Sequence, residues 1–508
     1  MQKTFTTGKN KDFLSFKQQN LLRKRIYSLF LIFLLLCACL FTSCPNPIIA
    51  WIAFDKSGVD LKLIPLFTSI EDAIAWLALQ PNGTQNNPVS LALNINLGTM
   101  PSSEWLNLLT EIERVGKYVN LDLSACGMDT TVFNLNSTVQ TGKDRIVSLV
   151  LPNEAIIIAN GTFPNFLFNN FDSLTSVTGR NVITIGEWTF MNRITLQSIS
   201  FPAAESIGYM SFGGCRTLAH VNLPRATTIG QQAFSGCTAL TNINLPMATT
   251  IDSRAFYNCT ALTNKNLPMA KTIESNAFYQ CIGLTTVNFP SAIYIGEFAF
   301  IGCTALRTVN LPEVITIEHG AFLSCTALQT VNLPKATDIG INTLLLEQGV
   351  FSKCTALQTV NLPMAINIGD STFDSCTALQ TINLPAAEII GLLAFGKCTA
   401  LHTVDLPVVT EFDQGAFYST GDIALSITLG DIVPTMDERL FSDVNSPKSV
   451  TVRVPNVPAW DLIVSSSPYD NLDTTSNNWG NAFRGIGWNG TTYLGDPVND
   501  NITLVVTH

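Results

Sequence analysis

The sequence predicts a solenoid built from 22-residue coils with short parallel strands, and three observations support this prediction. The ten residues CTALQTVNLP occupy positions 325–334, recur at 354–363, and return with Val changed to Ile at 376–385. The leucine of this motif recurs from Leu174 to Leu401 with a step of 22 residues, apart from one step of 29. A phenylalanine column follows the same steps from Phe190 to Phe417. Fixed periods of this size are typical of chains whose repeats stack along one axis.

Within one coil, the residue pattern indicates a single short strand with one buried face. Val360 and Leu362 alternate with Thr359 and Asn361, which is the period of a β-strand. Pro363 follows directly and ends the strand, because proline has no N–H to donate to a neighbour. One coil cannot bury its own apolar edge, so like side chains are expected to stack between coils as Leu, Val/Ile, Phe and Cys ladders.

The repeat LxxVxLPxxxxxIGxxAFxxCxx, over roughly residues 146–424, resembles the leucine-rich repeat of BspA-type bacterial surface proteins. The resemblance implies a leucine-rich repeat solenoid that is secreted or exposed on the cell surface. Several members of that family are implicated in adhesion to host extracellular matrix proteins and in contact between cells. The resemblance therefore implies an adhesin or protein-binding scaffold, with host extracellular matrix or other cells as partners.

The N-terminal segment has the layout of an export signal. Basic residues at 23–25 precede an apolar run at 26–41, and small residues followed by cysteine end at Cys39 and Cys44. The cysteine at such a cleavage site resembles the lipobox of bacterial lipoproteins. Residues 1–43 are therefore expected to be a lipoprotein signal peptide, with lipidation at Cys44 or alternatively at Cys39. The resemblance implies a lipid-anchored protein of the bacterial cell envelope, on its outer surface. A plain membrane anchor is the alternative, although the apolar run is shorter than the ~20 residues of a spanning helix.

The remaining sequence outside the repeats is expected to form a tether and two caps. Residues 44–68 are assigned to the tether, and residues 69–145 to a small α/β N-terminal cap with an irregular first coil. Capping serines and apolar residues at helical spacing predict helices at 69–80 and 103–116. The solenoid follows at 146–424, and a loop-rich C-terminal cap occupies 425–508.

The charge balance argues against nucleic acid as a partner. The chain has 28 basic and 38 acidic residues, a net charge of −10. Because the first 43 residues hold seven basic residues and one acidic residue, their removal leaves a net charge of about −16. Such a surface is repelled by phosphate backbones.

The sequence offers no catalytic, cofactor-binding or metal-binding set, which predicts that the protein is not an enzyme. Nine cysteines from Cys215 to Cys398 share one column, but their 22-residue spacing and the lack of a CxxC pair do not suit zinc. These cysteines are expected either as buried free thiols in a tight turn or as disulfides between neighbouring coils. The four histidines fall in different columns, none at metal-ligand spacing from another.

The candidate binding face is the outward side of the strands, where threonine and asparagine recur. Its residues are Thr286, Asn288, Thr308, Asn310, Thr330, Asn332, Thr359, Asn361, Thr381 and Asn383. One interpretation is a docking surface for an extended partner, because solenoids use repeated faces for binding. A second is that these side chains only form cross-strand ladders on a wetted surface. A third is an ice-binding grid of threonines.

The 29-residue coil supplies a second candidate, a loop that contains Leu344, Leu345 and Leu346. Insertions in solenoids map to loops that often lie on a binding face. Three exposed leucines would form an apolar patch of the kind that marks partner sites, whereas the alternative is that they fold back over the rod.

Two other functions remain open at this stage. One is a structural envelope protein without a soluble ligand. The other is a carbohydrate-binding protein that uses the C-terminal region, where Trp460, Trp479 and Trp488 could stack on sugars. No oligomeric state follows from the repeat pattern.

Overall fold

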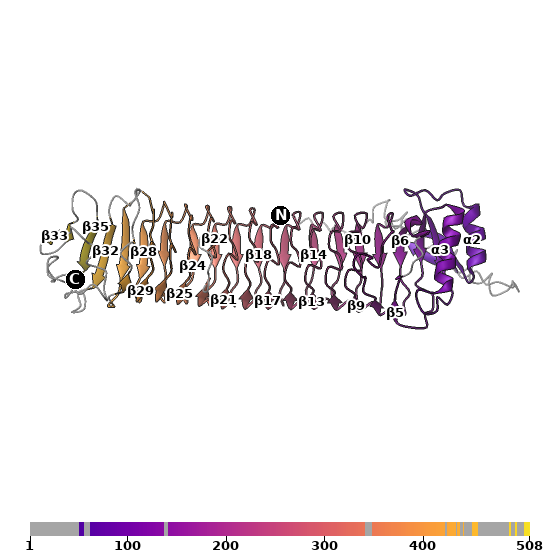
Figure 1. Cartoon of the computed structure of the whole chain (residues 1–508), viewed down its shortest axis with the longest axis horizontal. Coiled ribbons are helices and arrows are strands. Elements are labelled where there is room, and N and C mark those ends of the chain that lie inside the picture. The colour runs from indigo at the N-terminus through magenta and orange to yellow at the C-terminus, as the bar shows by residue number, and fades with distance from the viewer. Residues whose placement is uncertain are drawn as a thin grey trace, which may run out of the picture.

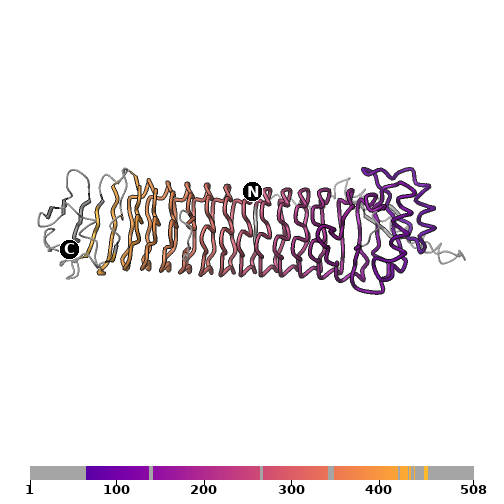
Figure 2. Tube along the Cα trace, in the orientation of Figure 1, coloured from indigo at the N-terminus to yellow at the C-terminus, as the bar shows by residue number. Residues whose placement is uncertain are grey.

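The computed structural model is an elongated rod of stacked coils with helices at its N-terminal end (Figure 1). The structure describes residues 50–54, 61–136, 141–340, 348–421, 424–432, 434–436, 440, 450–455, 487–488, 493–494 and 502–507. Two rows of strands run side by side along the rod, and successive coils lie next to one another in sequence order (Figures 1 and 2). The predicted solenoid of 22-residue coils with parallel strands is confirmed.

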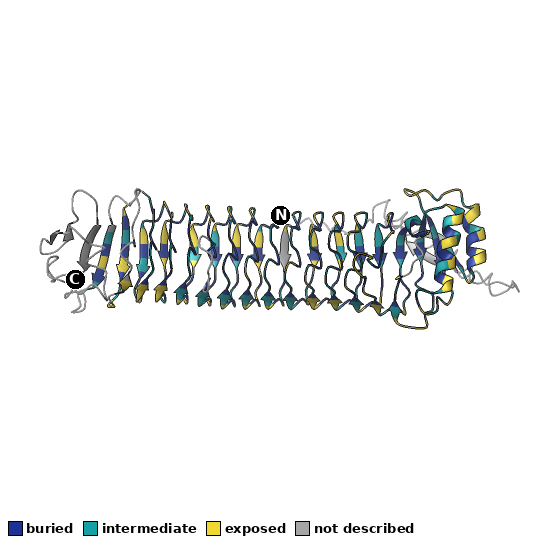
Figure 3. Cartoon of the chain, viewed as in Figure 1, coloured by how far each residue is buried: buried dark blue, intermediate teal, exposed yellow. Residues whose placement is uncertain are grey.

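The N-terminal cap contains both predicted helices. Helix α2 spans Ile70–Leu79, and the Ser69 hydroxyl accepts a hydrogen bond from the backbone N–H of Asp72. Helix α3 spans Ser103–Val115, and the Ser102 hydroxyl caps it in the same way. The buried faces of both helices lie on the core, and their outer faces are exposed (Figure 3). The helices thus cover the otherwise open apolar end of the solenoid.

The first row of strands begins before the cap and continues past the last repeat. Ahead of the cap it has β1 (Ala50–Phe54) and β2 (Leu61–Phe67), and within the cap it has β3 (Val89–Leu93) and β4 (Val119–Asp122). Its strands along the rod are β6 (Ile146–Val150), β8 (Ser176–Thr178), β10 (Ser198–Ser200), β12 (His220–Asn222), β14 (Asn242–Asn244), β16 (Asn264–Asn266), β18 (Thr286–Asn288), β20 (Thr308–Asn310), β22 (Thr330–Asn332), β24 (Thr359–Asn361), β26 (Thr381–Asn383), β28 (Thr403–Leu406), β30 (Leu425–Leu429), β32 (Val450–Pro455) and β35 (Ile502–Thr507). Hydrogen bonding divides this row into three sheets, with breaks between β14 and β16 and between β24 and β26.

The second row consists of two-residue strands and forms one continuous 14-stranded sheet in the described part of the chain. Its strands are β5 (Val132–Phe133), β7 (Ile157–Ile158), β9 (Thr184–Ile185), β11 (Ser206–Ile207), β13 (Thr228–Ile229), β15 (Thr250–Ile251), β17 (Thr272–Ile273), β19 (Tyr294–Ile295), β21 (Thr316–Ile317), β23 (Asp338–Ile339), β25 (Asn367–Ile368), β27 (Ile389–Ile390), β29 (Glu411–Phe412) and β31 (Thr435–Met436). The remaining elements are the 3-10 helix η1 (Lys143–Arg145) and the antiparallel pair β33 (Gly487–Trp488) and β34 (Tyr493–Leu494).

Strands also occur in segments that the sequence analysis assigned to a tether and to a loop-rich cap. Strands β1 and β2 lie within residues 44–68 and pair with each other, and β2 pairs with β3 of the N-terminal cap. Strands β30, β32 and β35 lie within residues 425–508 and extend the first row in parallel register.

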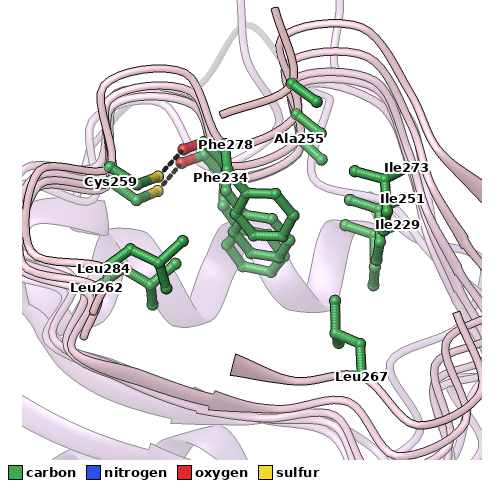
Figure 4. Packing of buried hydrophobic residues seen from close by; sticks show 14 of the residues in the cluster. Ile229, Phe234, Ile251, Ala255, Cys259, Leu262, Leu267, Ile273, Phe278 and Leu284 are labelled. Carbon is green, nitrogen blue, oxygen red and sulfur yellow. Dashed lines mark hydrogen bonds between the residues drawn. The ribbon is translucent and has the colours of Figure 1, made fainter. Parts of the chain in front are cut away.

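The core consists of side-chain ladders that run along the rod, as the repeat predicts. Phenylalanine rings from Phe190 to Phe417 stack from coil to coil with centroids 5.1–5.6 Å apart and planes within 15° of parallel. The leucines Leu240, Leu262 and Leu284 are fully buried beside them. Figure 4 shows the Ile, Phe, Cys and Leu columns side by side in the interior. Each column stays continuous because the coils repeat with the same backbone path.

Candidate binding face

The outward face of the first row carries the ten predicted residues in regular positions. In β18 and β20 the central valine points inward and is buried, whereas both threonines are exposed. The strands pair without a shift, so Thr286, Thr308, Thr330 and Thr359 lie in one row. The asparagines form a second row two residues further along each strand. The result is a regular grid without formal charge.

Asn288, Asn310, Asn332 and Asn361 are joined by side-chain hydrogen bonds. The Asn310 Nδ2 donates to the Asn288 Oδ1 at 3.1 Å, and the Asn332 Nδ2 donates to the Asn310 Oδ1 at 2.7 Å. The Asn361 Nδ2 donates to the Asn332 Oδ1 at 2.7 Å. This asparagine ladder is the cross-strand arrangement that the sequence analysis considered. These hydrogen bonds do not use every donor and acceptor of the asparagine side chains, since each amide carries two N–H donors and an oxygen with two lone pairs.

The last pair of predicted residues belongs to a different sheet. Thr381 and Asn383 are exposed and lie in β26, which pairs with β28 rather than with β24. The structure therefore brings eight of the ten residues together in one sheet and places two in the next sheet along the rod.

Several predicted site residues lie outside the described part of the chain. These are Cys39 and Cys44, the loop leucines Leu344, Leu345 and Leu346, and Trp460 and Trp479. The backbone of Trp488 lies in β33. In the residues that the structure does describe, no helix has both the length and the apolar composition needed to cross a membrane.

A hollow in the strand face is a feature that the sequence analysis missed. It has a volume of about 390 Å³ and lies over β10, β12 and β14, and its lining residues are Ile199, His220, Val221, Asn222, Asn242, Ile243 and Asn244. The central residue Val221 is only half-buried, whereas Val287 in the corresponding position of β18 is 1% exposed. His220 and Asn242 stand where the predicted face has threonines, and both line the hollow. The change from threonine to histidine and asparagine in this column is the sequence signal that marks the place.

The cysteine column is a structural ladder of free, buried thiols. Each thiol lies within hydrogen-bond distance of a phenylalanine carbonyl oxygen in the preceding coil. For example, the Cys237 Sγ donates to the Phe212 oxygen at 3.2 Å, and the Cys303 Sγ donates to the Phe278 oxygen at 3.2 Å. Burial raises the pKa of the Cys215 thiol to about 12, so this group stays protonated and unreactive at neutral pH. Of the two alternatives, the structure shows free thiols and not disulfides.

The described histidines lie apart from one another and in different surroundings. His220 is exposed in β12, and the His402 Nδ1 lies 3.0 Å from the Thr403 hydroxyl. His319 is buried against the Phe298 ring, and its Nδ1 is 3.9 Å from a Glu297 carboxylate oxygen. Across the described ranges, no group of three or more His, Cys, Asp or Glu side chains is arranged to hold a metal ion.

Comparisons with known proteins agree with the repeat architecture. The family model described as the BspA type leucine rich repeat region matches in six copies, over residues 161–270, 249–345, 271–386 and 335–448. These matches together span residues 161–448, which is more than half of the chain. No curated protein matches the chain.

Parts of this chain are similar to solved structures of leucine-rich repeat proteins from two bacteria. A leucine-rich repeat protein from Bacteroides ovatus is 23% identical, with 61% of this chain and 87% of that chain covered and a TM-score of 0.45. A leucine rich cell surface protein from Faecalibacterium prausnitzii is 23% identical, with 51% and 87% covered and a TM-score of 0.29. By the family match over its repeats, the chain belongs to the BspA-type leucine-rich repeat family.

Proposed function

We propose that this protein is a cell-surface adhesin, in which the solenoid is a scaffold that presents a protein-binding face. The observation that supports this function most directly is the grid of threonine and asparagine on β18, β20, β22 and β24. Solenoids bind partners on such repeated, extended surfaces. The grid has no formal charge, so a partner can dock without the cost of desolvating ions. The proposed partners are host extracellular matrix proteins or proteins on other cells.

The asparagine ladder favours binding because it fixes the amides before a partner arrives. Each ladder bond restrains the side chain on both sides of it, which lowers the conformational entropy lost on association. The spare N–H and oxygen lone pairs of these amides match the donors and acceptors of a protein main chain. The loop with Leu344, Leu345 and Leu346 is proposed as a second, apolar contact.

A binding experiment with purified protein and a panel of immobilised matrix proteins tests this function. We expect the double variant Thr308→Lys, Thr359→Lys to bind at least tenfold more weakly than the wild type. Both threonines are exposed on the grid and lie outside the asparagine ladder. The matched control is Thr228→Lys, Ile389→Lys, which places the same charge on exposed residues of the second row.

The outcomes of this experiment separate the candidate functions. An effect below twofold in the control, with a large loss in the grid variant, supports the adhesin proposal. If binding is lost only when residues 343–349 are deleted, the partner contacts the loop and not the grid. Absence of binding across the panel contradicts the proposal and favours a structural envelope protein. Binding to polysaccharide that is lost on replacing Trp460, Trp479 and Trp488 with alanine would instead support the carbohydrate-binding alternative.

The proposed position is the outer surface of the bacterial envelope, held by a lipid on Cys44. We expect Cys44→Ala to abolish the incorporation of a labelled fatty acid into the protein, because the thiol that carries the acyl group is removed. Cys39→Ala is the matched control and should still incorporate the label. The reverse result assigns the lipid to Cys39, and absence of label on the wild type contradicts a lipid anchor.

A further inference from the structure

Three methionines of the rod are exposed at one and the same position of the repeat. Met247, Met269 and Met364 each follow the proline that comes after a first-row strand, and they are 49%, 46% and 53% exposed. We propose that these methionines are modification sites, at which peroxides form methionine sulfoxide while the interior of the rod stays reduced and folded. This inference goes beyond the proposed adhesin function and does not depend on the partner.

A tight turn holds each of these side chains outside the core. In the coil of Met247, the Ala248 N–H donates to the Leu245 oxygen at 3.3 Å, and both Leu245 and Ala248 are fully buried. The other two coils have the same bond, from Ala270 to Leu267 at 3.2 Å and from Ala365 to Leu362 at 3.4 Å. Because both ends of the turn are fixed in the core, the methionine between them stays in contact with solvent.

The same position of the repeat accepts charged side chains in other coils. It holds Arg225, Glu313 and Lys335. The Lys335 Nζ lies 2.7 Å from a Glu313 carboxylate oxygen, and Arg225 forms a 3.1 Å ion pair with Glu205. A sulfoxide is polar but carries no net charge. Oxidation therefore adds a polar oxygen at a position where the fold already accommodates full charges at the surface.

The sulfur atoms of the interior are shielded from the same oxidants. Cys237 and Cys259 are fully buried, and Met100 in the N-terminal cap is 4% exposed. Burial also raises the pKa of the Cys237 thiol well above its ordinary value, so the reactive thiolate is scarce at neutral pH. A peroxide reaches these atoms only if the fold opens, whereas it reaches the exposed thioethers in the native state.

The reaction at each exposed methionine is an oxygen-atom transfer from the peroxide. A sulfur lone pair attacks one oxygen of hydrogen peroxide, an S–O bond forms, and the O–O bond breaks. The departing hydroxide takes up the proton of the transferred hydroxyl group and leaves as water. The sulfur is oxidised by two electrons and the peroxide is reduced by two, and the sulfoxide can be reduced again by methionine sulfoxide reductases.

Treatment of the purified full-length protein with hydrogen peroxide, followed by peptide mapping with mass spectrometry, tests the proposal. We expect sulfoxide to form at Met247, Met269 and Met364 at least about tenfold faster than at Met100, since access to the sulfur sets the rate. The buried cysteines from Cys126 to Cys398 should stay unmodified. The melting temperature should not change when only the three sites are oxidised, and methionine sulfoxide reductases with dithiothreitol should reverse the modification.

A pair of variants separates the surface from the interior. Glutamine is an uncharged polar side chain and imitates the sulfoxide. The variant Met247→Gln, Met269→Gln, Met364→Gln should therefore melt at the wild-type temperature and take up no oxygen at these positions. The matched interior variant Met100→Gln buries an amide and should melt at a lower temperature.

Oxidation of Met100 at a rate comparable to the three exposed sites overturns the proposal, and so does oxidation of the buried cysteines while the protein is folded. A lower melting temperature of the triple glutamine variant, or of protein oxidised only at the three sites, overturns it as well. The rate comparison uses the wild-type protein, so it holds even if the Met100→Gln variant does not fold.

Discussion

The phenylalanine ladder inside the rod and the asparagine ladder on its surface follow the same repeat but stabilise it differently. Phe278 is fully buried between Phe256 and Phe300, with both ring centroids 5.2 Å away. Asn332 lies on the outer face and exchanges hydrogen bonds with Asn310 and Asn361. The interior ladder removes apolar surface from water, whereas the surface ladder replaces hydrogen bonds to water with hydrogen bonds between amides.

This difference explains how one repeat can both build a uniform interior and present a variable surface. A buried column must fill the same volume in every coil, so its residues change little along the rod. A surface column needs only compatible polar groups, so it can vary from threonine to histidine and create local shapes such as the hollow. The interior therefore sets the fold, and the outer face is available for recognition.

The largest expected effect is a loss of stability at high pH, and it comes from the cysteine ladder, which is buried like the phenylalanine ladder. Burial raises the pKa of seven thiols in the cysteine ladder above the ordinary value of 9.0, namely Cys215, Cys237, Cys303, Cys325, Cys354, Cys376 and Cys398. Below pH 9 these thiols are protonated in both states, and their contribution to stability is fully present. As the pH rises above 9, the unfolded chain loses these protons while the folded chain keeps them. The free energy of unfolding then falls, by up to about 1.4 kcal/mol per thiol and pH unit.

Urea unfolding at a series of pH values between 9 and 10.5 measures this decline. Lysines and tyrosines titrate in a similar range, so the comparison is made with a Cys303→Ala, Cys325→Ala variant. Its decline should be less steep by up to about 2.8 kcal/mol per pH unit, since two thiols are missing. An unchanged slope would contradict the burial of protonated thiols.

Truncation of one ring in the interior ladder should have the next largest effect. We expect Phe278→Ala to lower the free energy of unfolding by about 3–5 kcal/mol, because it removes a buried ring and leaves a cavity between two others. Phe163 is 76% exposed, so Phe163→Ala should cost less than about 0.5 kcal/mol. Similar losses for the two variants in urea unfolding would mean that the rings do not form a packed column.

The smallest effect is expected on the surface ladder. Asn332→Ala removes two side-chain hydrogen bonds from a partly exposed position and should cost about 1 kcal/mol. The matched substitution Asn383→Ala, in the exposed equivalent position of β26, should cost less than about 0.5 kcal/mol. A cost at Asn332 as large as that at Phe278 would show that the surface ladder is essential to the fold.

The sequence was sufficient to predict the interior and most of the outer face. The spacing of Leu240, Leu262 and Leu284 predicted a stacked column, because burial imposes the same residue in each coil. The alternation around Val287 and Val309 likewise predicted which threonines and asparagines point outward. The Ser69 cap of α2 was predictable because a helix start depends on local hydrogen bonds, whereas α3 is capped by Ser102, one residue before the predicted segment 103–116.

Other features depend on information that no single coil contains. Strands of the second row, such as Thr250–Ile251, have two residues, which is too short to show an alternating pattern. The hollow is lined by His220 and Asn242, which replace the threonine of the repeat without forming a motif. The pairing of β2 with β3 depends on the cap around it, so residues 61–67 were assigned, with the rest of residues 44–68, to a tether.

The coil that carries the seven-residue insertion keeps every ladder intact. The Phe322 and Phe351 rings on either side of it stack at 5.6 Å, and the Cys354 Sγ reaches the Phe322 oxygen at 3.2 Å. Strands β22 and β24 also pair without a shift across this longer step. Duplication or loss of a whole coil would join equivalent ends in the same manner, so the length of the rod can evolve in uniform increments without redesign of its interior.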